Sequence, residues 1–301
     1  MLQDFFHVVV QAPSLDAMTE AYARTFDYRL VAAEPVAPEL ARAWGAPAMV
    51  GRRSALMRPA SGVESWIRFV EGEAAPELGV LGWNGIELLV ENLDDVEARI
   101  ARSPFRVFSP PQALSISDKV RFMQVIGPSG ELLFLNEMGD PALRVGRARS
   151  PVDRPFVLTC GTLRVAETLE WFRRTLGADA AEPFPVVMPA LNRIFGFAEG
   201  SAHALGMVRM AGPCILELDE YPLSAMPKRS APGALPAGVA LVSCSTEAVG
   251  PVADALKARS VRIDAPPYDG AEAVLLKTPE GALLEIVWRR SGLLEQMASA
   301  A

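Results

Sequence analysis

The 301-residue sequence repeats itself at an offset of about 150 residues, and no other feature constrains its fold as strongly. Residues 21–26 (Ala-Tyr-Ala-Arg-Thr-Phe) align with 171–176 (Trp-Phe-Arg-Arg-Thr-Leu). Residues 127–135, which begin Gly-Pro-Ser-Gly, align with 278–286, which begin Thr-Pro-Glu-Gly, and an apolar strand pattern follows both turns. We therefore predict a tandem duplication.

Each half is predicted to contain two units, and each unit a strand, a helix and further strands. The predicted helices cover residues 14–26, 93–100, 166–176 and 247–259. The predicted strands cover residues 5–11, 54–58, 65–70, 85–91, 121–126, 131–136, 156–161, 205–210, 214–219, 239–243, 273–277 and 282–287. Four βαβββ units account for the whole length, so the predicted fold class is α+β.

The domain boundaries follow from the repeat and from a composition change in its middle. Residues 139–155 are rich in Pro, Gly and Arg and have little apolar periodicity, as is typical of a connector. We expect an N-terminal domain over 1–139, a linker over 140–155, a C-terminal domain over 156–290 and a tail over 291–301.

Composition excludes several classes of protein. With 36 acidic and 29 basic residues, the net charge is -7, which argues against nucleic acid as a partner. No uncharged apolar run reaches the ~18 residues of a membrane helix, and no leader pattern begins the chain, so we expect a cytoplasmic protein without a membrane partner. Three cysteines without CxxC spacing indicate neither a disulfide framework nor a zinc knuckle.

The repeated pattern resembles the vicinal oxygen chelate superfamily, which includes glyoxalases, extradiol dioxygenases and bleomycin-resistance proteins. Four features carry the resemblance: the opening strand 6–10 with His7, the helices that contain Tyr22 or Phe172, the strand-to-helix segment 89–95, and the terminal Pro-x-Gly-x-Leu-Leu in both halves. The resemblance implies a tandem pair of domains. In each domain, two βαβββ units would form a half-open mixed β cup that holds the ligand or metal.

The resemblance also implies where metal ligands would stand. In metal-using members, one His comes from the first strand of a domain, a second His from the matching strand of the next unit, and a Glu from the final strand. In the first half, His7 fits the first position, Gly85 falls near the second, with Glu87 on the same face, and Phe134 takes the third.

In the second half, Glu285 fits the final-strand position, and Glu217 lies where some relatives place a further ligand. The first strand there offers only Val157 or Thr159. Neither half carries the full set, so we expect no cofactor, while a divalent metal stays open. His203, Glu217 and Glu285 would be its first ligand candidates.

The candidate site of the second half rests on Glu217 and Glu285. A carboxylate among apolar residues has a raised pKa and can serve as a general acid or base. Asn192, Arg193 and His203, in the irregular stretch 188–204, would bind an anionic or phenolic oxygen. The alternative is that the two carboxylates form structural ion pairs, for example with Arg193 or Arg209.

The candidate site of the first half rests on His7 as a general base oriented by Glu87. Arg68, Trp66 and Trp83 would bind the substrate, with the two indoles stacking on a flat molecule. The alternative is that His7 is a core residue.

These residues predict a small-molecule enzyme. We expect a metal-independent lyase or isomerase that applies carboxylate and His general acid–base chemistry to oxygenated substrates, aromatic ones included. A non-catalytic binding protein of the bleomycin-resistance kind is the first alternative, and a metal-dependent dioxygenase or glyoxalase-like enzyme is the second. Whether the chain forms a homodimer stays open.

Overall fold

The fold comes from a computed structural model that describes residues 2–76, 78–114, 117–140, 143, 145–247, 256 and 259–288. Most of the predicted helix 247–259 and all of the predicted tail 291–301 lie outside the described residues. Within the described ranges, no helix has the length and apolar character needed to cross a membrane.

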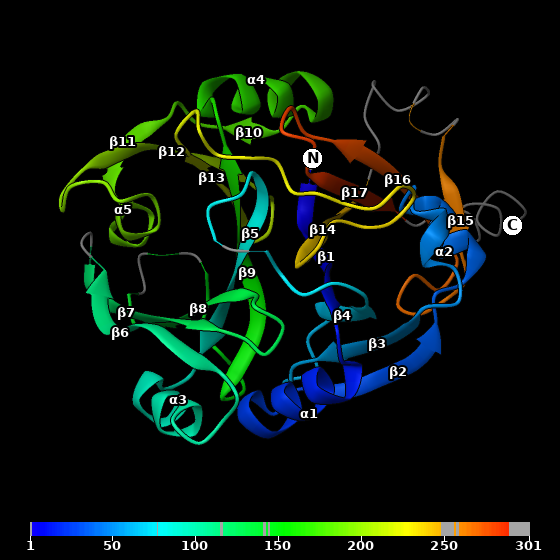
Figure 1. The fold of residues 1–301 in the computed structure, drawn as a ribbon, viewed down its shortest axis with the longest axis horizontal. Helices are drawn as coiled ribbons and strands as arrows, with labels where there is room; N and C mark the ends of the chain where they lie inside the picture. Colours follow the sequence, from blue (N-terminus) through cyan, green and yellow to red (C-terminus); the bar gives the residue numbers. More distant parts are fainter. Residues whose placement is uncertain are drawn as a thin grey trace, which may run out of the picture.

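Three βαβββ units and the strands of a fourth follow one another along the described part of the chain (Figure 1). The first contains β1 (Leu2–Ala12), α1 (Leu15–Phe26), β2 (Arg29–Pro35), α2 (Pro38–Ala43), the 3-10 helix η1 (Pro47–Met49), β3 (Arg53–Arg58) and β4 (Trp66–Glu71). The second contains β5 (Gly82–Val90), α3 (Leu93–Ile100), β6 (Arg106–Leu114), β7 (Ser117–Ile126) and β8 (Leu132–Met138).

The third unit contains β9 (Val152–Thr162), α4 (Val165–Leu176), β10 (Asp179–Ala180), β11 (Phe184–Val187), α5 (Pro189–Phe195), β12 (Ala202–Arg209) and β13 (Ile215–Glu220). The described part of the fourth contains β14 (Val239–Thr246), β15 (Val261–Ile263), β16 (Ala271–Lys277) and β17 (Leu283–Trp288). Five strands were not predicted from the sequence: β2, β6, β10, β11 and β15. They lie at the edges of the sheets, and all but the three-residue β15 are largely exposed, so they lack an apolar alternation.

Local sequence signals set the ends of the helices. Ser14 caps α1, since its Oγ accepts a hydrogen bond from the amide of Ala17 at 3.2 Å. Asn92 caps α3 in the same way, with bonds from the amides of Asp94 and Asp95. Gly177 ends α4 in the left-handed conformation (φ 60°), as a glycine at this position usually does.

The four units form two curled mixed sheets, which confirms the predicted fold class of paired βαβββ units. The pairing of units along the chain, however, differs from the expected one. An eight-stranded sheet, ordered β15-β16-β17-β14-β1-β4-β3-β2, joins the first unit to the fourth. A nine-stranded sheet, ordered β10-β12-β13-β9-β5-β8-β7-β6, joins the second unit to the third, and β11 pairs with β12. The first–second and third–fourth pairs expected from chain order do not share a sheet.

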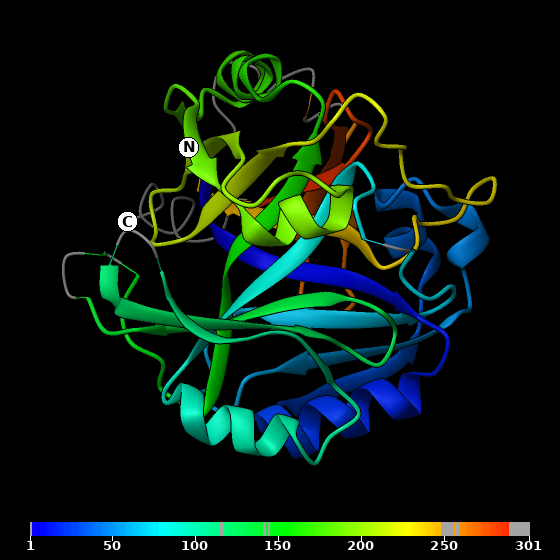
Figure 2. The ribbon, with the colours of Figure 1, turned by 60° about the vertical axis from the view of Figure 1, so that its left-hand side comes forward.

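The reason is antiparallel pairing between opening strands: β1 pairs with β14, and β5 pairs with β9. All four opening strands are apolar and largely buried, so the sequence repeat alone does not specify which two pair. We call the concave face of the eight-stranded sheet the first cup and that of the nine-stranded sheet the second cup. Figure 2 shows β1 and β5 crossing the centre of the molecule.

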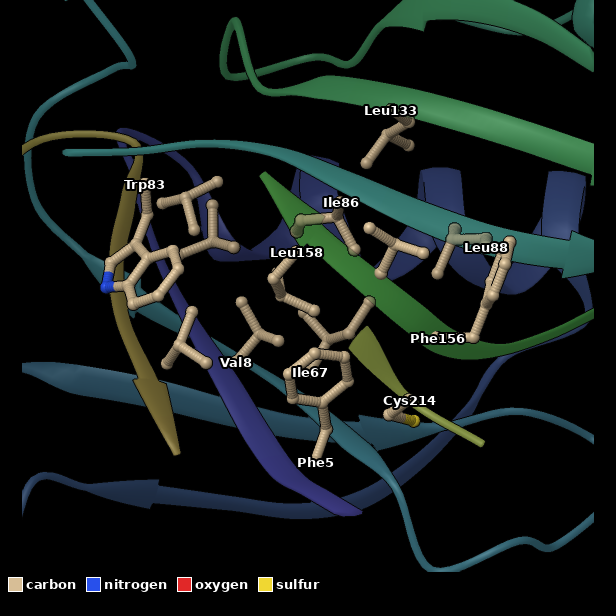
Figure 3. Close-up of a cluster of buried hydrophobic side chains, with 14 of the residues drawn as sticks. Phe5, Val8, Ile67, Trp83, Ile86, Leu88, Leu133, Phe156, Leu158 and Cys214 are labelled. Atoms are coloured by element: carbon tan, nitrogen blue, oxygen red, sulfur yellow. The ribbon is translucent and has the colours of Figure 1, made fainter. Parts of the chain in front are cut away.

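The main hydrophobic core lies between the two sheets. Figure 3 shows part of it, where Val8 of β1 lies near Trp83 of β5 and Leu158 of β9. All three side chains are at most 1% exposed. This packing fixes the central strands, and the residues that alternate with the core residues project into the cups.

Candidate functional site

The strand registers show which residues occupy equivalent places in the two cups. In the eight-stranded sheet, Val9 pairs with Arg68, His7 with Ser243, and Ser243 with Glu285. At the equivalent places of the nine-stranded sheet, Thr159 pairs with Glu217, Val157 with Glu87, and Glu87 with Phe134. The residues at four equivalent central positions are therefore His7, Arg68, Ser243 and Glu285 in the first cup, and Val157, Glu217, Glu87 and Phe134 in the second.

The first cup contains a buried polar cluster around Glu285. His7 and Glu285 are both 0% exposed, with 4.0 Å between His7 Nδ1 and Glu285 Oε2. The same Oε2 accepts hydrogen bonds from the Tyr268 hydroxyl at 2.7 Å and from the Ser243 hydroxyl. Glu285 lies on the same face of β17 as Leu283 and Val287, whereas Leu284 and Ile286 face the main core.

Burial dominates the electrostatics of this cluster. It raises the pKa of Glu285 to about 7, although hydrogen bonds from Ser243 and Tyr268 and the charge of Arg68 favour the carboxylate. Burial, together with the charge of Arg68, holds the pKa of His7 well below its usual value. The cup therefore holds a neutral imidazole beside a carboxyl group that changes its protonation near neutral pH.

Several polar atoms of the first cup have no partner. Both ring nitrogens of His7, Nε of Arg68 and Oε1 of Glu285 are buried without a hydrogen bond to any described residue. Each such group costs about 1–3 kcal/mol of stability. Natural proteins contain few of them, and a group of four in one place indicates a site that receives a ligand or solvent.

A hydrophobic cover closes the first cup. Leu40 of α2, Trp44 and Met49 of η1 are at most 3% exposed and belong to the same cluster as Tyr268. Trp66 lies on the same face of β4 as Arg68 and is 8% exposed. Beneath this cover, His7 and Glu285 have no exposed surface.

The second cup contains three carboxylates, Glu87, Glu217 and Asp219, all partly exposed. Burial and the neighbouring Asp219 raise the pKa of Glu87 to about 8, although a hydrogen bond of 3.2 Å from Asn136 lowers it. Burial, Asp219 and Glu87 raise the pKa of Glu217 well above its usual value, and burial raises that of Asp219 to about 7. Burial is thus the largest cause of the raised pKa of all three groups, and repulsion between carboxylates adds to it for Glu87 and Glu217.

The structure separates the residues that were expected to act together. Glu217 and Glu285 lie in different cups, and so do His7 and Glu87, because each sheet joins units from both halves of the chain. The predicted combinations were wrong on this point. The alternative ion pairs with Arg193 or Arg209 are absent as well: in the described part of the chain, no basic side chain lies within 4.0 Å of the carboxylate of Glu217.

Two residues of the stretch 188–204 have local partners. Asn192 Oδ1 lies 2.6 Å from Nε2 of His203, and the Asn192 amide donates to the carbonyl of Ser201 at 3.0 Å. Neither residue contacts Glu285, because this stretch belongs to the nine-stranded sheet.

Arg193 and Trp83 are engaged in contacts between units. The Arg193 guanidinium donates to the Phe108 carbonyl at 2.8 Å and lies 5.1 Å from the centre of the Phe108 ring, so α5 bridges to β6. Trp83 is 1% exposed, and its Nε1 donates to the carbonyl of Leu283 at 2.7 Å. Trp83 is thus a core residue, which corrects its assignment as a stacking surface.

Ser243, Tyr268 and Asp219 were not among the site residues predicted from the sequence. Ser243 has the strand parity of a cup residue, and Asp219 shares the parity of Glu217, so alternation along both strands was an available signal. Tyr268 lies in the loop between β15 and β16, where the sequence carries no periodic signal.

Nearly the whole chain superposes on two solved structures. Glyoxalase I from Zea mays matches with a TM-score of 0.63 at 13% identity, over 94% of this chain and 92% of that one. A putative dioxygenase from Bacillus subtilis matches with a TM-score of 0.61 at 14% identity, over 97% and 86% of the two chains. The chain has the vicinal oxygen chelate fold. At these identities the likeness concerns the fold alone. A comparison of the sequence with protein families and curated proteins finds no match.

The residues of the two cups do not fit the metal set of His, His and Glu that the resemblance in sequence implies. In the first cup, His7 and Glu285 remain, but the cationic Arg68 stands at one of the four equivalent positions and would repel a divalent ion. In the second cup, Val157 and Phe134 offer no ligand atom. Across the described residues, no three His, Cys, Asp or Glu side chains are arranged to hold a metal ion.

Proposed function

We propose that the first cup is the active site of a lyase or isomerase that removes a proton next to a carbonyl group by general base catalysis, without a bound metal. One observation carries the proposal: Glu285, with a pKa of about 7, is held by Tyr268 and Ser243 beside the neutral His7. A base whose pKa lies near the working pH is unprotonated in a large share of the molecules and still has enough affinity for the proton that it removes.

The two carboxylate oxygens of Glu285 have different roles in this proposal. Oε2 is fixed by the hydroxyls of Tyr268 and Ser243, which leaves the unpartnered Oε1 to take the proton from carbon. The electron pair of the broken C–H bond moves onto the carbonyl oxygen of the substrate, and the nearby positive charge of Arg68 stabilises the resulting enolate electrostatically. Return of the proton to another carbon, or to the other face, completes an isomerisation; loss of a group from the neighbouring carbon completes an elimination.

The aromatic residues around His7 favour a substrate with a flat apolar part. The ring of Phe6 lies edge-on to those of Trp66 and Tyr268, with centroids 5.3 and 5.2 Å apart, and His7 lies 5.4 Å from Tyr268. The second cup differs in charge rather than in aromatic content, because Phe195 and Tyr221 pack edge-on beside its carboxylates as well, with ring centroids 5.1 Å apart. Its three carboxylates have no described basic neighbour within 4.0 Å that would stabilise an enolate.

Hydrogen exchange at carbon tests the proposal before the natural substrate is known. The protein is incubated in D2O with a panel of aromatic and aliphatic carbonyl compounds, and loss of the proton next to the carbonyl is followed by NMR. We expect Glu285→Gln to slow exchange by about 10²- to 10⁴-fold. Glu131→Gln is the matched control, because Glu131 is also buried (1% exposed) with a pKa raised to about 7, but it bonds to Tyr22 and Ser129 instead.

Two results would contradict the proposal. One is equal loss of exchange in Glu285→Gln and Glu131→Gln, since the effect would then reflect a general change in folding. The other is ligand binding by the wild-type protein without any exchange, which would indicate a binding protein of the bleomycin-resistance kind.

A further inference from the structure

Arg68 is a buried cation without an ion pair. Its side chain is 4% exposed, and no described Asp or Glu lies within 4.0 Å of its guanidinium. Its hydrogen-bond partners are neutral: the Ser54 hydroxyl at 3.1 Å and the Pro266 carbonyl. Buried charges in proteins are normally paired, because an uncompensated one costs several kcal/mol.

The remaining donors of Arg68 point to an anion. A guanidinium has five N–H groups, and Nε of Arg68 is buried without a partner. Nε and a terminal nitrogen together form the fork that binds both oxygens of a carboxylate. Glu285 acts on Arg68 electrostatically, but neither of its oxygens lies within 4.0 Å of the Arg68 guanidinium, so it does not supply this partner.

The residues of the second cup support an anion site at Arg68 by contrast. The position equivalent to Arg68 there is Glu217, and its neighbours are Glu87 and Asp219. One cup thus carries an unpaired buried cation and the other a surplus of carboxylates. Among the described residues, the first cup therefore has the charge that attracts an anionic substrate, and the second does not.

We infer that Arg68 binds the carboxylate of the substrate, so that the enzyme acts on small carboxylic acids. This deepens the proposed function and rests on it for the chemical step. The charge balance favours a planar monoanion: it neutralises Arg68, whereas a phosphate or sulfate dianion would leave a net negative charge beside Glu285. Phe6 and Trp66 would contact the apolar remainder of the acid.

Benzoate is the probe, measured by calorimetry against benzamide, its neutral isostere, and against inorganic phosphate. We expect wild-type protein to bind benzoate more tightly than either. Arg68→Met should weaken benzoate binding by about 10- to 100-fold, because a charge-assisted hydrogen bond is lost. Arg68→Lys keeps the charge but not the fork of two N–H groups, so its affinity for benzoate should lie between those of the wild type and Arg68→Met. Arg52→Met, a change of an exposed arginine in the same unit, should bind as the wild type does.

Equal binding of benzoate and benzamide, absence of benzoate binding, or unchanged benzoate binding in Arg68→Met would each overturn the inference. Phosphate binding as tight as benzoate binding would overturn the choice of a monoanion. Failure of this inference can be distinguished from failure of the proposed function. If benzoate binds through Arg68 while no carbonyl compound exchanges its proton, the proposed chemistry fails and the anion site stands.

Discussion

Replacing Glu285 by Gln should change how stability depends on pH. Folding raises the pKa of Glu285 from 4.5 to about 7, mainly because the carboxyl group is buried. A raised acid pKa means that the folded state favours the protonated form. Its stabilising contribution is complete below pH 4.5 and is lost as pH rises to about 7 and beyond. At about 1.4 kcal/mol per pH unit, the loss amounts to about 3 kcal/mol.

Gln cannot ionise, so the variant escapes this loss. Relative to wild type, the free energy of unfolding of Glu285→Gln should therefore increase by about 3 kcal/mol between pH 4.5 and pH 8. For a chain of this size that corresponds to a relative gain of about 5 °C in melting temperature. Urea unfolding at pH 4.5, 6, 7 and 8 measures the difference directly.

The control for this experiment is Glu131→Gln, which should show the same trend, since burial also raises the pKa of Glu131 to about 7. A stability difference between Glu285→Gln and wild type that stays constant from pH 4.5 to pH 8 would refute the reasoning. It would mean that the folded state does not perturb this carboxyl group.

Four further outcomes are expected. Asp219→Asn should lower the pKa of Glu87 from about 8, as followed by NMR titration, because Asp219 is its repelling neighbour; an unchanged titration would contradict that cause. Trp83→Phe should cost about 1–3 kcal/mol in urea unfolding, because the buried carbonyl of Leu283 loses its donor, with exchange per folded molecule unchanged. Proton exchange should rise with pH up to about 7, as Glu285 ionises, and a flat profile would argue against this base. Chelation by EDTA should leave exchange intact, and loss that added divalent metal restores would contradict the metal-free mechanism.

The sequence predicted the units but not their partners. Turn signals at an offset of about 150 residues specify that the same order of elements occurs twice, and burial periodicity locates most strands. Tertiary packing decides which opening strands pair, because the four segments are similarly apolar. This is why His7 was assigned to Glu87, although it lies beside Glu285.

Site residues were predictable only where alternation along a strand reveals them. His7, Arg68 and Glu285 have the parity of cup residues and do face the first cup. Tyr268 and the covering helix α2 carry no such signal, because their place depends on the sheet that they cover. The domain boundaries 1–139, 140–155, 156–290 and 291–301 stay a prediction.

The central claim is that the first cup, and not the second, carries out the chemistry. Its most direct test compares proton exchange by Glu285→Gln and Glu217→Gln under identical conditions, per folded molecule. The account predicts a loss of about 10²- to 10⁴-fold for Glu285→Gln and an unchanged rate for Glu217→Gln. A normal rate in Glu285→Gln together with a loss in Glu217→Gln would contradict it and place the active site among the carboxylates of the second cup.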